Sequence, residues 1–310
     1  MNGRDVRTAD GRSATMTGAA PVSRPLLALD GSPRRPDLIG VVAFDAIRYG
    51  TAVTMRGVEQ AARRAGYGTC IVELERPDDT GMAEAIRRLS RQPVVGTVII
   101  APLTPAVTTG SLRSAVPTVV VGAETAGPVQ APTVDHELGA RLAVEHLLNL
   151  GHDTVWHLSG PQDWRQAQHR TDGWRSALER AGRSVPQVMV GNWGAQSGYE
   201  AGHRLVDRAD VTAVFCASDQ QAMGMLRALC ERGVRVPDDI SIVGYDDIPE
   251  AEYLTPSLTT VRQDFDGLGR SCLTTLLATI EQRDPLATAG QQWATPTLVV
   301  RASSGPPRTR

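Results

Sequence analysis

Polar side chains follow three of the short apolar runs in this sequence, directly after the point where each run ends. Asp45 comes after LIGVVAF, Ser218 and Asp219 come after VTAVFCA, and Asp246 and Asp247 come after DISIVGY. Such acids have three chemical uses: a pair of acids for proton transfer, acceptors for the hydroxyls of a ligand, or caps for the helices that follow. The choice among these uses depends on the elements that carry the acids.

Apolar runs alternate with helical segments from residue 38 to residue 300. Strand–helix alternation predicts parallel sheets with right-handed crossovers, and the length favours two similar α/β halves with a break near residues 132–135. We predict strands at 38–44, 69–74, 94–102, 116–122, 154–161, 185–191, 211–218, 239–245 and 295–300. We predict helices at 53–66, 82–91, 136–150, 169–182, 198–208, 219–233 and 267–282.

The carboxyl ends of these strands are the expected place for a ligand, because open parallel sheets bind ligands beyond that edge. Adjacent strand-end residues point in different directions, which argues against Asp246 and Asp247 as the acid pair of a glycosidase. Asp246 lies closer to the strand and is predicted to face a ligand cleft. Asp247 and Asp219 each precede a helical or turn segment, so they are predicted to act as helix caps.

Three further side chains have two interpretations each. Arg170, at the start of a predicted helix, would either bind a polyhydroxy or anionic ligand through its planar guanidinium or form a surface ion pair. Trp193 in GNWGAQSGY and Phe265 in RQDFDGLG are isolated aromatic residues among polar neighbours. Each would either stack on a sugar ring or anchor a loop.

The sequence lacks the signatures of the common enzyme and metal-site classes. It contains no lysine, so a P-loop lysine, a Schiff-base lysine and a lysine general base are excluded. It contains no GxSxG, HExxH or GxGxxG motif, and the spacing of His152 and His157 suits no metal pair. We therefore predict no catalytic residue, no metal ligand and no cofactor.

Composition is that of an ordinary globular protein, with 41% hydrophobic residues, 21% charged residues and a formal net charge of −2. This near-neutral balance provides no basic footprint for nucleic acid along the body of the chain. The four cysteines lie far apart, and neither a bilayer-spanning stretch nor a secretory signal is recognisable. These features predict a cytoplasmic protein that does not engage a membrane.

Residues 1–37 differ in composition from the rest. They are rich in Gly, Ala, Ser, Thr, Pro and Arg and show little apolar periodicity, so a disordered tail without a complete helix-turn-helix is predicted.

Residues 38–300 resemble the lactose/galactose repressor (LacI/GalR) family of bacterial transcription regulators. Four blocks carry the resemblance: VPDDISIVGYDDIPEAEYLTPSLTTVRQDF, FCASDQQAMGMLRALCERG, LAVEHLLNLGHDTVWHLSGP and RTDGWRSALERAG. GNWGAQSGY and TTVRQDFDGLG look closest to the lactose-repressor branch. The resemblance implies a two-lobed fold like that of periplasmic sugar-binding proteins. Its parts would be an N-terminal lobe at 38–134, a C-terminal lobe at 135–262 and return segments at 263–310.

The resemblance also implies a ligand site between the lobes. Asp246 would accept hydrogen bonds from ligand hydroxyls, and Arg170 would hold the ligand from the other side of the same lobe. The remaining positions that the resemblance assigns to this site are Phe44 or Asp45, Trp193, Ser218, Gln263 and Phe265. Gly122 stands where the lactose-binding relative has an acid, and Ser218 stands where Asn is frequent, so a shifted pattern of ligand hydroxyls is expected.

The implied function is that of a carbohydrate-responsive regulator, acting as a homodimer because the tetramer-forming heptads of the family are missing after Val300. Operator DNA is an expected partner only if a helix-turn-helix lies upstream. The lack of a complete helix-turn-helix in this sequence would reflect truncation of the chain, a misassigned start or true loss of the unit. The alternative is a cytosolic sugar-binding module or sensor without DNA-binding activity, and a sugar-processing enzyme has the least support.

Overall fold

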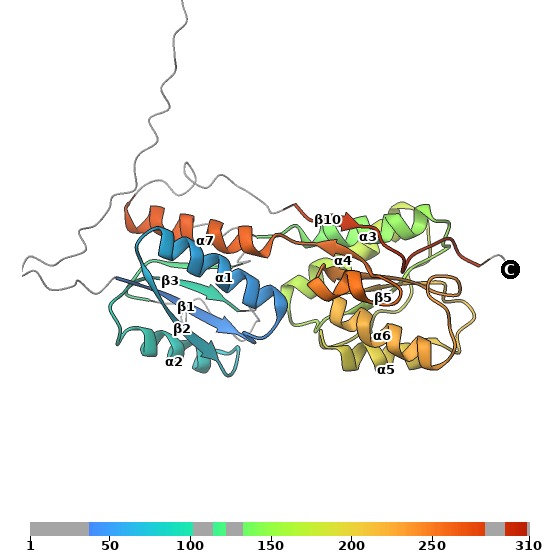
Figure 1. Cartoon of the computed structure of the whole chain (residues 1–310), viewed down its shortest axis with the longest axis horizontal. Helices are drawn as coiled ribbons and strands as arrows, with labels where there is room; N and C mark the ends of the chain where they lie inside the picture. The colour runs from blue at the N-terminus through green and yellow to red at the C-terminus, as the bar shows by residue number, and fades with distance from the viewer. Residues whose placement is uncertain (1–36, 102–113, 122–132, 283–294, 309–310) are drawn as a thin grey trace, which may run out of the picture. The chain divides into compact units, whose positions relative to one another are not determined.

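The computed structural model describes residues 37–101, 114–121, 133–282 and 295–308. Within them two sheets are formed, and we refer to the parts built on them as the four-stranded half and the six-stranded half (Figure 1). Gly122, at which the sequence suggested a departure from the family, lies outside the described residues.

The four-stranded half contains a parallel sheet in the order β2-β1-β3-β4. The strands carry apolar side chains on both faces, so helices pack on both faces of the sheet. Val41 and Val98 belong to the core under α1 and α7, and Val42 and Ile99 belong to the core under α2. The elements are β1 (Leu38–Phe44), α1 (Tyr49–Arg64), β2 (Gly68–Leu74), α2 (Asp79–Leu89), β3 (Val94–Ile100), β4 (Thr118–Val120) and, much later in the chain, α7 (Phe265–Ile280).

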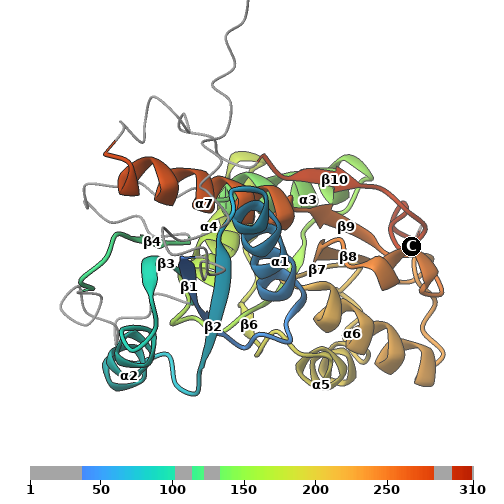
Figure 2. The same ribbon diagram turned by 60° about the vertical axis from the view of Figure 1, so that its left-hand side comes forward.

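The six-stranded half contains a sheet in the order β10-β9-β8-β7-β5-β6. One of its cores lies under α5 and α6, which pack side by side (Figure 2), and the other lies under α3 and α4. The elements are α3 (His136–Asn149), β5 (Trp156–Ser159), α4 (Arg165–Arg180), β6 (Met189–Val190), α5 (Ala195–Leu205), β7 (Ala213–Cys216), α6 (Asp219–Glu231), β8 (Ser241–Asp246), a 3-10 helix (Pro249–Tyr253), β9 (Thr259–Arg262) and β10 (Thr297–Val299).

The predicted α/β class is confirmed, with one difference in strand direction. β10 pairs with β9 in the antiparallel sense, so the larger sheet is mixed rather than purely parallel. Within the described residues, its hydrogen-bonded neighbour is β9 alone, which makes it an edge strand, and edge strands are where sheets of this kind most often reverse direction.

Helix ends follow the sequence more closely than helix starts. The predicted stops at Gly66, Gly151 and Gly182 all have positive φ, as expected at helix C-termini. In contrast, α1, α4 and α5 begin three to four residues before their predicted starts. Arg48, Trp164 and Gly194 precede these helices without a side-chain cap, so no local signal marked the first turn.

The length and polarity of the described helices rule out a bilayer span for each of them. The four cysteines are all free thiols.

Candidate functional site

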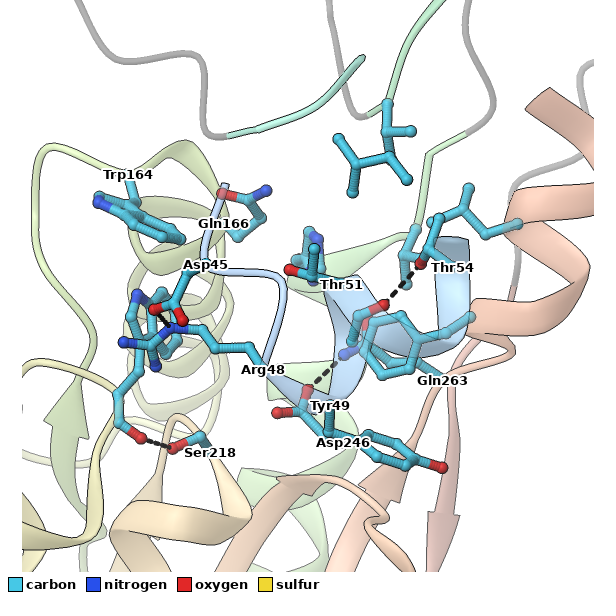
Figure 3. A pocket seen from close by; sticks show the side chains of 18 of the residues that line it. Asp45, Arg48, Tyr49, Thr51, Thr54, Trp164, Gln166, Ser218, Asp246 and Gln263 are labelled. Carbon is cyan, nitrogen blue, oxygen red and sulfur yellow. Dashed lines mark hydrogen bonds and ion pairs between the residues drawn. The ribbon is translucent and has the colours of Figure 1, made fainter. Parts of the chain in front are cut away.

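A cavity of about 400 Å³ lies where β1 of one half and β7 and β8 of the other come to their carboxyl ends (Figure 3). Seven of the eight site residues expected from the sequence line it: Asp45, Arg170, Trp193, Ser218, Asp246, Gln263 and Phe265. Their side chains come from both halves, because Asp45 follows β1 and Phe265 begins α7, whereas Arg170 lies on α4.

Asp246 is the most enclosed acid that lines this cavity. Its side chain is 14% exposed, its Oδ1 accepts a hydrogen bond from Gln263 Nε2 at 2.6 Å, and the same oxygen lies 3.5 Å from Arg170 Nη2. Burial raises the pKa of the Asp246 carboxyl to about 6, and the opposing effects of Arg170, Gln263 and Arg48 do not cancel this rise. The carboxyl group is therefore poised to gain from additional hydrogen-bond donors.

Arg170 is a buried cation with one donor unused. Its guanidinium lies over the ring of Tyr245, 3.8 Å from the centroid, and 5.1 Å from that of Trp193. Nη1 donates to the carbonyl of Ala217, and Nε has no hydrogen-bond partner within the described residues. Leaving a buried donor without a partner is costly. The alternative prediction of a surface ion pair is wrong, because Arg170 is 5% exposed.

Ser218 and Trp193 form one connected part of the wall. Ser218 is the N-cap of α6, where its Oγ accepts from the Gln221 amide at 3.2 Å and donates to the carbonyl of Trp193 at 2.8 Å. Trp193 has a φ of 69°, a conformation that a non-glycine residue adopts only when its surroundings hold it there. Its ring lies against Gly160, where any Cβ would overlap it, and packs on Trp164 at 5.7 Å between centroids.

Phe265 presents an aromatic edge from the four-stranded half. It is the first residue of α7, and its ring meets that of Tyr49 edge-on at a centroid distance of 5.9 Å. The ring also lies against Gly50, where an added Cβ would be 2.9 Å from the ring. The cavity thus has aromatic side chains in the walls from both halves, which suits the apolar faces of a ring-shaped ligand.

Phe44 is the expected residue that does not line the cavity. Its ring packs edge-on against Trp164, with 5.9 Å between centroids, so it supports a lining residue instead of contributing to the wall. Of the two alternatives at the end of β1, only Asp45 lines the cavity. Its φ of 52° is in the left-handed region.

The two acids expected to cap helices do something else. Asp247 receives Arg262 Nε at 2.6 Å and Arg301 Nη2 at 2.7 Å, whereas the N-cap of the following 3-10 helix is Ile248 without a side-chain bond. Asp219 is the first residue inside α6, and the cap is Ser218. The cap prediction is wrong for both acids. Their carboxylates are bonded instead to groups that are distant in sequence.

Several lining residues were missed by sequence reasoning. Three of them lie at helix starts that come earlier than predicted: Arg48, Tyr49 and Trp164. The sequence analysis assigned them to loops, where their positions could not be predicted. His136 lies at the start of α3, and burial together with Arg170 and His169 holds its pKa well below the usual value. The apolar side chains Ile47, Ile100, Val121, Val134 and Leu268 also line the cavity.

Comparison with known proteins identifies the family. A family model described as a periplasmic binding protein-like domain matches residues 144–304. The lactose operon repressor of Escherichia coli K12 is 32% identical over 276 residues, which cover 88% of this chain and 76% of the repressor. The chain belongs to the lactose repressor family.

Solved structures of this family show the same fold. A lactose repressor dimer bound to operator and the anti-inducer ONPF superposes with a TM-score of 0.80 at 30% identity, covering 88% of this chain and 95% of that one. The transcriptional regulator CelR in complex with cellobiose gives a TM-score of 0.77 at 29% identity, covering 87% and 85% of the two chains. The family resemblance and the periplasmic-binding-protein-like fold predicted from the sequence are confirmed.

Membership of the family also bears on chemistry. The relatives named here are regulators rather than enzymes. Among the described side chains, no three histidine, cysteine or carboxylate groups converge as metal ligands would. The cavity is lined by hydrogen-bonding side chains and by aromatic rings.

Proposed function

We propose that this protein is a transcription regulator that binds a small carbohydrate in the cavity and changes its affinity for operator DNA in response. The observation that carries the proposal is the buried Asp246–Arg170 pair in a cavity flanked by Trp193 and Phe265. Family membership supports the link to DNA, since one relative is a dimer bound to operator and another is bound to cellobiose.

The polar and aromatic groups suit a sugar. A carboxylate accepts hydrogen bonds from hydroxyls, and a guanidinium donates to a hydroxyl or a ring oxygen. Aromatic faces cover the C–H faces of a sugar ring while hydroxyls are held at its rim. We assign Asp45, Trp193, Ser218, Gln263 and Phe265 to the same ligand site as wall residues. Binding of this kind forms no covalent bond, so we propose a binding protein rather than an enzyme.

The cavity joins the two halves, which provides the route from binding to regulation. Arg48 at the start of α1 lies with its Nη2 3.5 Å from the carbonyl oxygen of Asn192 in the six-stranded half. A ligand that contacts both halves stabilises the arrangement in which those contacts are made, and so shifts the population toward it. We propose that this shift alters the geometry of a homodimer and thereby its fit to operator DNA.

The organisation of the chain is part of the same proposal. Residues 38–134 would form one lobe, residues 135–262 the other, and residues 263–310 would complete both. The prediction for the N-terminal stretch falls on residues 1–36, which lie outside the described part of the chain. Operator binding requires a DNA-binding unit, such as a helix-turn-helix. A regulator of this kind acts in the cytoplasm, in keeping with four free cysteines.

Thermal melting against a panel of neutral sugars tests ligand binding. A sugar present at 100 times its Kd should stabilise the protein by about 2.7 kcal/mol. Asp246→Ala is expected to abolish that gain while the variant remains folded. Asp153→Ala is the control, because Asp153 has a side chain that is 96% exposed and should leave the response unchanged. An Asp246→Ala variant with unaltered sugar affinity would place the ligand elsewhere.

Gel shifts test regulation. The full-length protein is mixed with promoter fragments adjacent to its own gene, with and without the sugar found by melting. A sugar-dependent shift is the expected result. Sugar binding without a shift of any fragment would identify a sugar sensor without its own DNA-binding activity.

A further inference from the structure

A second carboxylate–guanidinium pair lines the cavity, in addition to the Asp246–Arg170 pair. Arg48 Nε donates to Asp45 Oδ2, and both residues line the wall. Arg48 is the residue before α1, with an extended backbone at φ −67° and ψ 139°, and it makes no capping bond. Its side chain extends along the wall toward Asp45, as Figure 3 shows.

The two pairs are built alike in the two halves. In each, the acid stands at the exit of a parallel strand with positive φ, 52° for Asp45 after β1 and 113° for Asp246 at the end of β8. Each acid is paired with an arginine at or within a helix of its own half, Arg48 before α1 and Arg170 in α4. The pairs differ in exposure: the Arg48 and Asp45 side chains are 36% and 24% exposed, whereas those of Arg170 and Asp246 are 6% and 14%.

Each pair leaves capacity for a ligand. The contacts of Gln263 and Arg170 with Asp246 both fall on Oδ1, and Arg48 contacts Asp45 through Oδ2. The second oxygen of each carboxylate takes part in none of these contacts. A hydroxyl can donate to such an oxygen and at the same time accept from a neighbouring guanidinium, so each pair matches a hydroxyl or a pair of neighbouring hydroxyls.

The charges of the described lining residues sum to zero. Asp45 and Asp246 balance Arg48 and Arg170, and the only histidine among them, His136, stays neutral because burial and Arg170 lower its pKa. A phosphate or carboxylate on the ligand would meet two carboxylates and two arginines that are already neutralised. It would also lose its hydration on entry, which is costly for a charge that gains no unpaired partner.

We propose that the Asp45–Arg48 and Asp246–Arg170 pairs together recognise an uncharged polyhydroxy ligand that spans both halves, and that they select against phosphorylated and carboxylated sugars. Arg48 is thereby a specificity-determining residue. The inference rests on the proposed effector-binding function and names the class of effector. Uncharged ligands are selected because each pair offers a hydrogen-bond acceptor and a donor side by side, while the two charges of the pair cancel.

Calorimetry and thermal melting with matched probes test the inference. The neutral probes are glucose, galactose, lactose and cellobiose, and the charged probes are glucose 6-phosphate, galactose 6-phosphate, glucuronate and galacturonate. We expect at least one neutral probe to bind, and the charged probes to bind at least about tenfold more weakly. Arg48→Leu should weaken the neutral probe about tenfold to a hundredfold, the range for loss of a charged hydrogen-bond donor.

Arg63→Leu is the matched control, since Arg63 lies on α1 with a side chain that is 73% exposed and pairs only loosely with Glu59 at 3.4 Å. It should leave affinity unchanged. Asp45→Asn supplies a second readout, because it leaves the positive charge of Arg48 without its acid. It should lower the affinity for the neutral probe and reduce the difference in affinity between neutral and charged probes.

Two results would overturn the inference and leave the effector-binding function standing: a charged probe that binds at least as tightly as every neutral one, or unchanged affinity in Arg48→Leu. Absence of a thermal shift with all eight probes would overturn both this inference and the proposed effector-binding function.

Discussion

Asp219 holds the backbone of Ile248, although 29 residues separate them in the chain. Asp219 Oδ2 accepts a hydrogen bond from the Ile248 amide at 2.8 Å, and Oδ1 accepts one from Thr260 Oγ1 at 2.5 Å. One buried carboxylate at the start of α6 thus fixes the segment after β8 and the neighbouring strand β9. The segment it fixes follows Asp246 and Asp247 directly.

Asp219→Ala should destabilise the protein by about 2–4 kcal/mol, because two buried donors lose their acceptor and a void is left. Urea unfolding at pH 7 measures the change. Asp153→Ala is the control for a change of aspartate to alanine at an exposed site, with an expected effect within about 0.5 kcal/mol. An equally small effect for Asp219→Ala would mean that the loop after β8 is held by other contacts.

Gly57→Ala should impair both stability and ligand binding. A Cβ at Gly57 would overlap the carbonyl oxygen of Asp266, so α1 and the start of α7 would move apart and displace Phe265 from the cavity wall. The expected loss is about 1–3 kcal/mol, the usual cost of overpacking. Differential scanning fluorimetry and calorimetry with the neutral sugar report the two effects.

Gly202→Ala provides the matched comparison. A Cβ there would lie 2.7 Å from that of Ala228, between α5 and α6. It should destabilise the fold by a similar amount and leave sugar affinity unchanged. Equal effects of the two variants on affinity would show that binding follows global stability and not the position of α7.

Asp246→Asn should remove a pH dependence of stability. The folded-state pKa of Asp246, about 6, lies above the ordinary value of 3.8, so the native state binds more protons than the unfolded chain between these values. The contribution of this group to stability is therefore largest at low pH and is lost as pH rises from about 4 to 6.

The difference in unfolding free energy, variant minus wild type, should thus rise by about 2–3 kcal/mol between pH 4 and pH 7. Urea denaturation at half-unit pH steps gives this difference. A constant difference over the range would show that the Asp246 carboxyl titrates in the folded protein as it does in the unfolded chain.

Local patterns accounted for the strands and helices except β9, and for the edge of the sheets at which the cavity lies. Continuous apolar runs such as residues 38–44 mark strands covered on both faces, and glycines such as Gly66 mark helix ends, because each signal is complete within a few residues. The position of Asp246 at the cavity follows from the same logic, since strands of a parallel sheet deliver their carboxyl ends to one edge.

The hydrogen-bond and ion-pair partners of these side chains could not be predicted from local patterns. The local pattern predicts caps at Asp247 and Asp219, yet Arg301 and Ile248 bind them across 54 and 29 residues. Arg48 carried no signal, because its role depends on an uncapped helix start and on the left-handed turn at Asp45.

The sequence by itself determined the α/β class, the family and the strand end on which the candidate acid stands, because these depend on short-range periodicity and on motifs preserved along the chain. Only the tertiary structure decided which arginine pairs with which acid and that the cavity carries two such pairs. Packing of helices and loops distant in sequence sets which side chains come within hydrogen-bonding distance, and no local pattern encodes it.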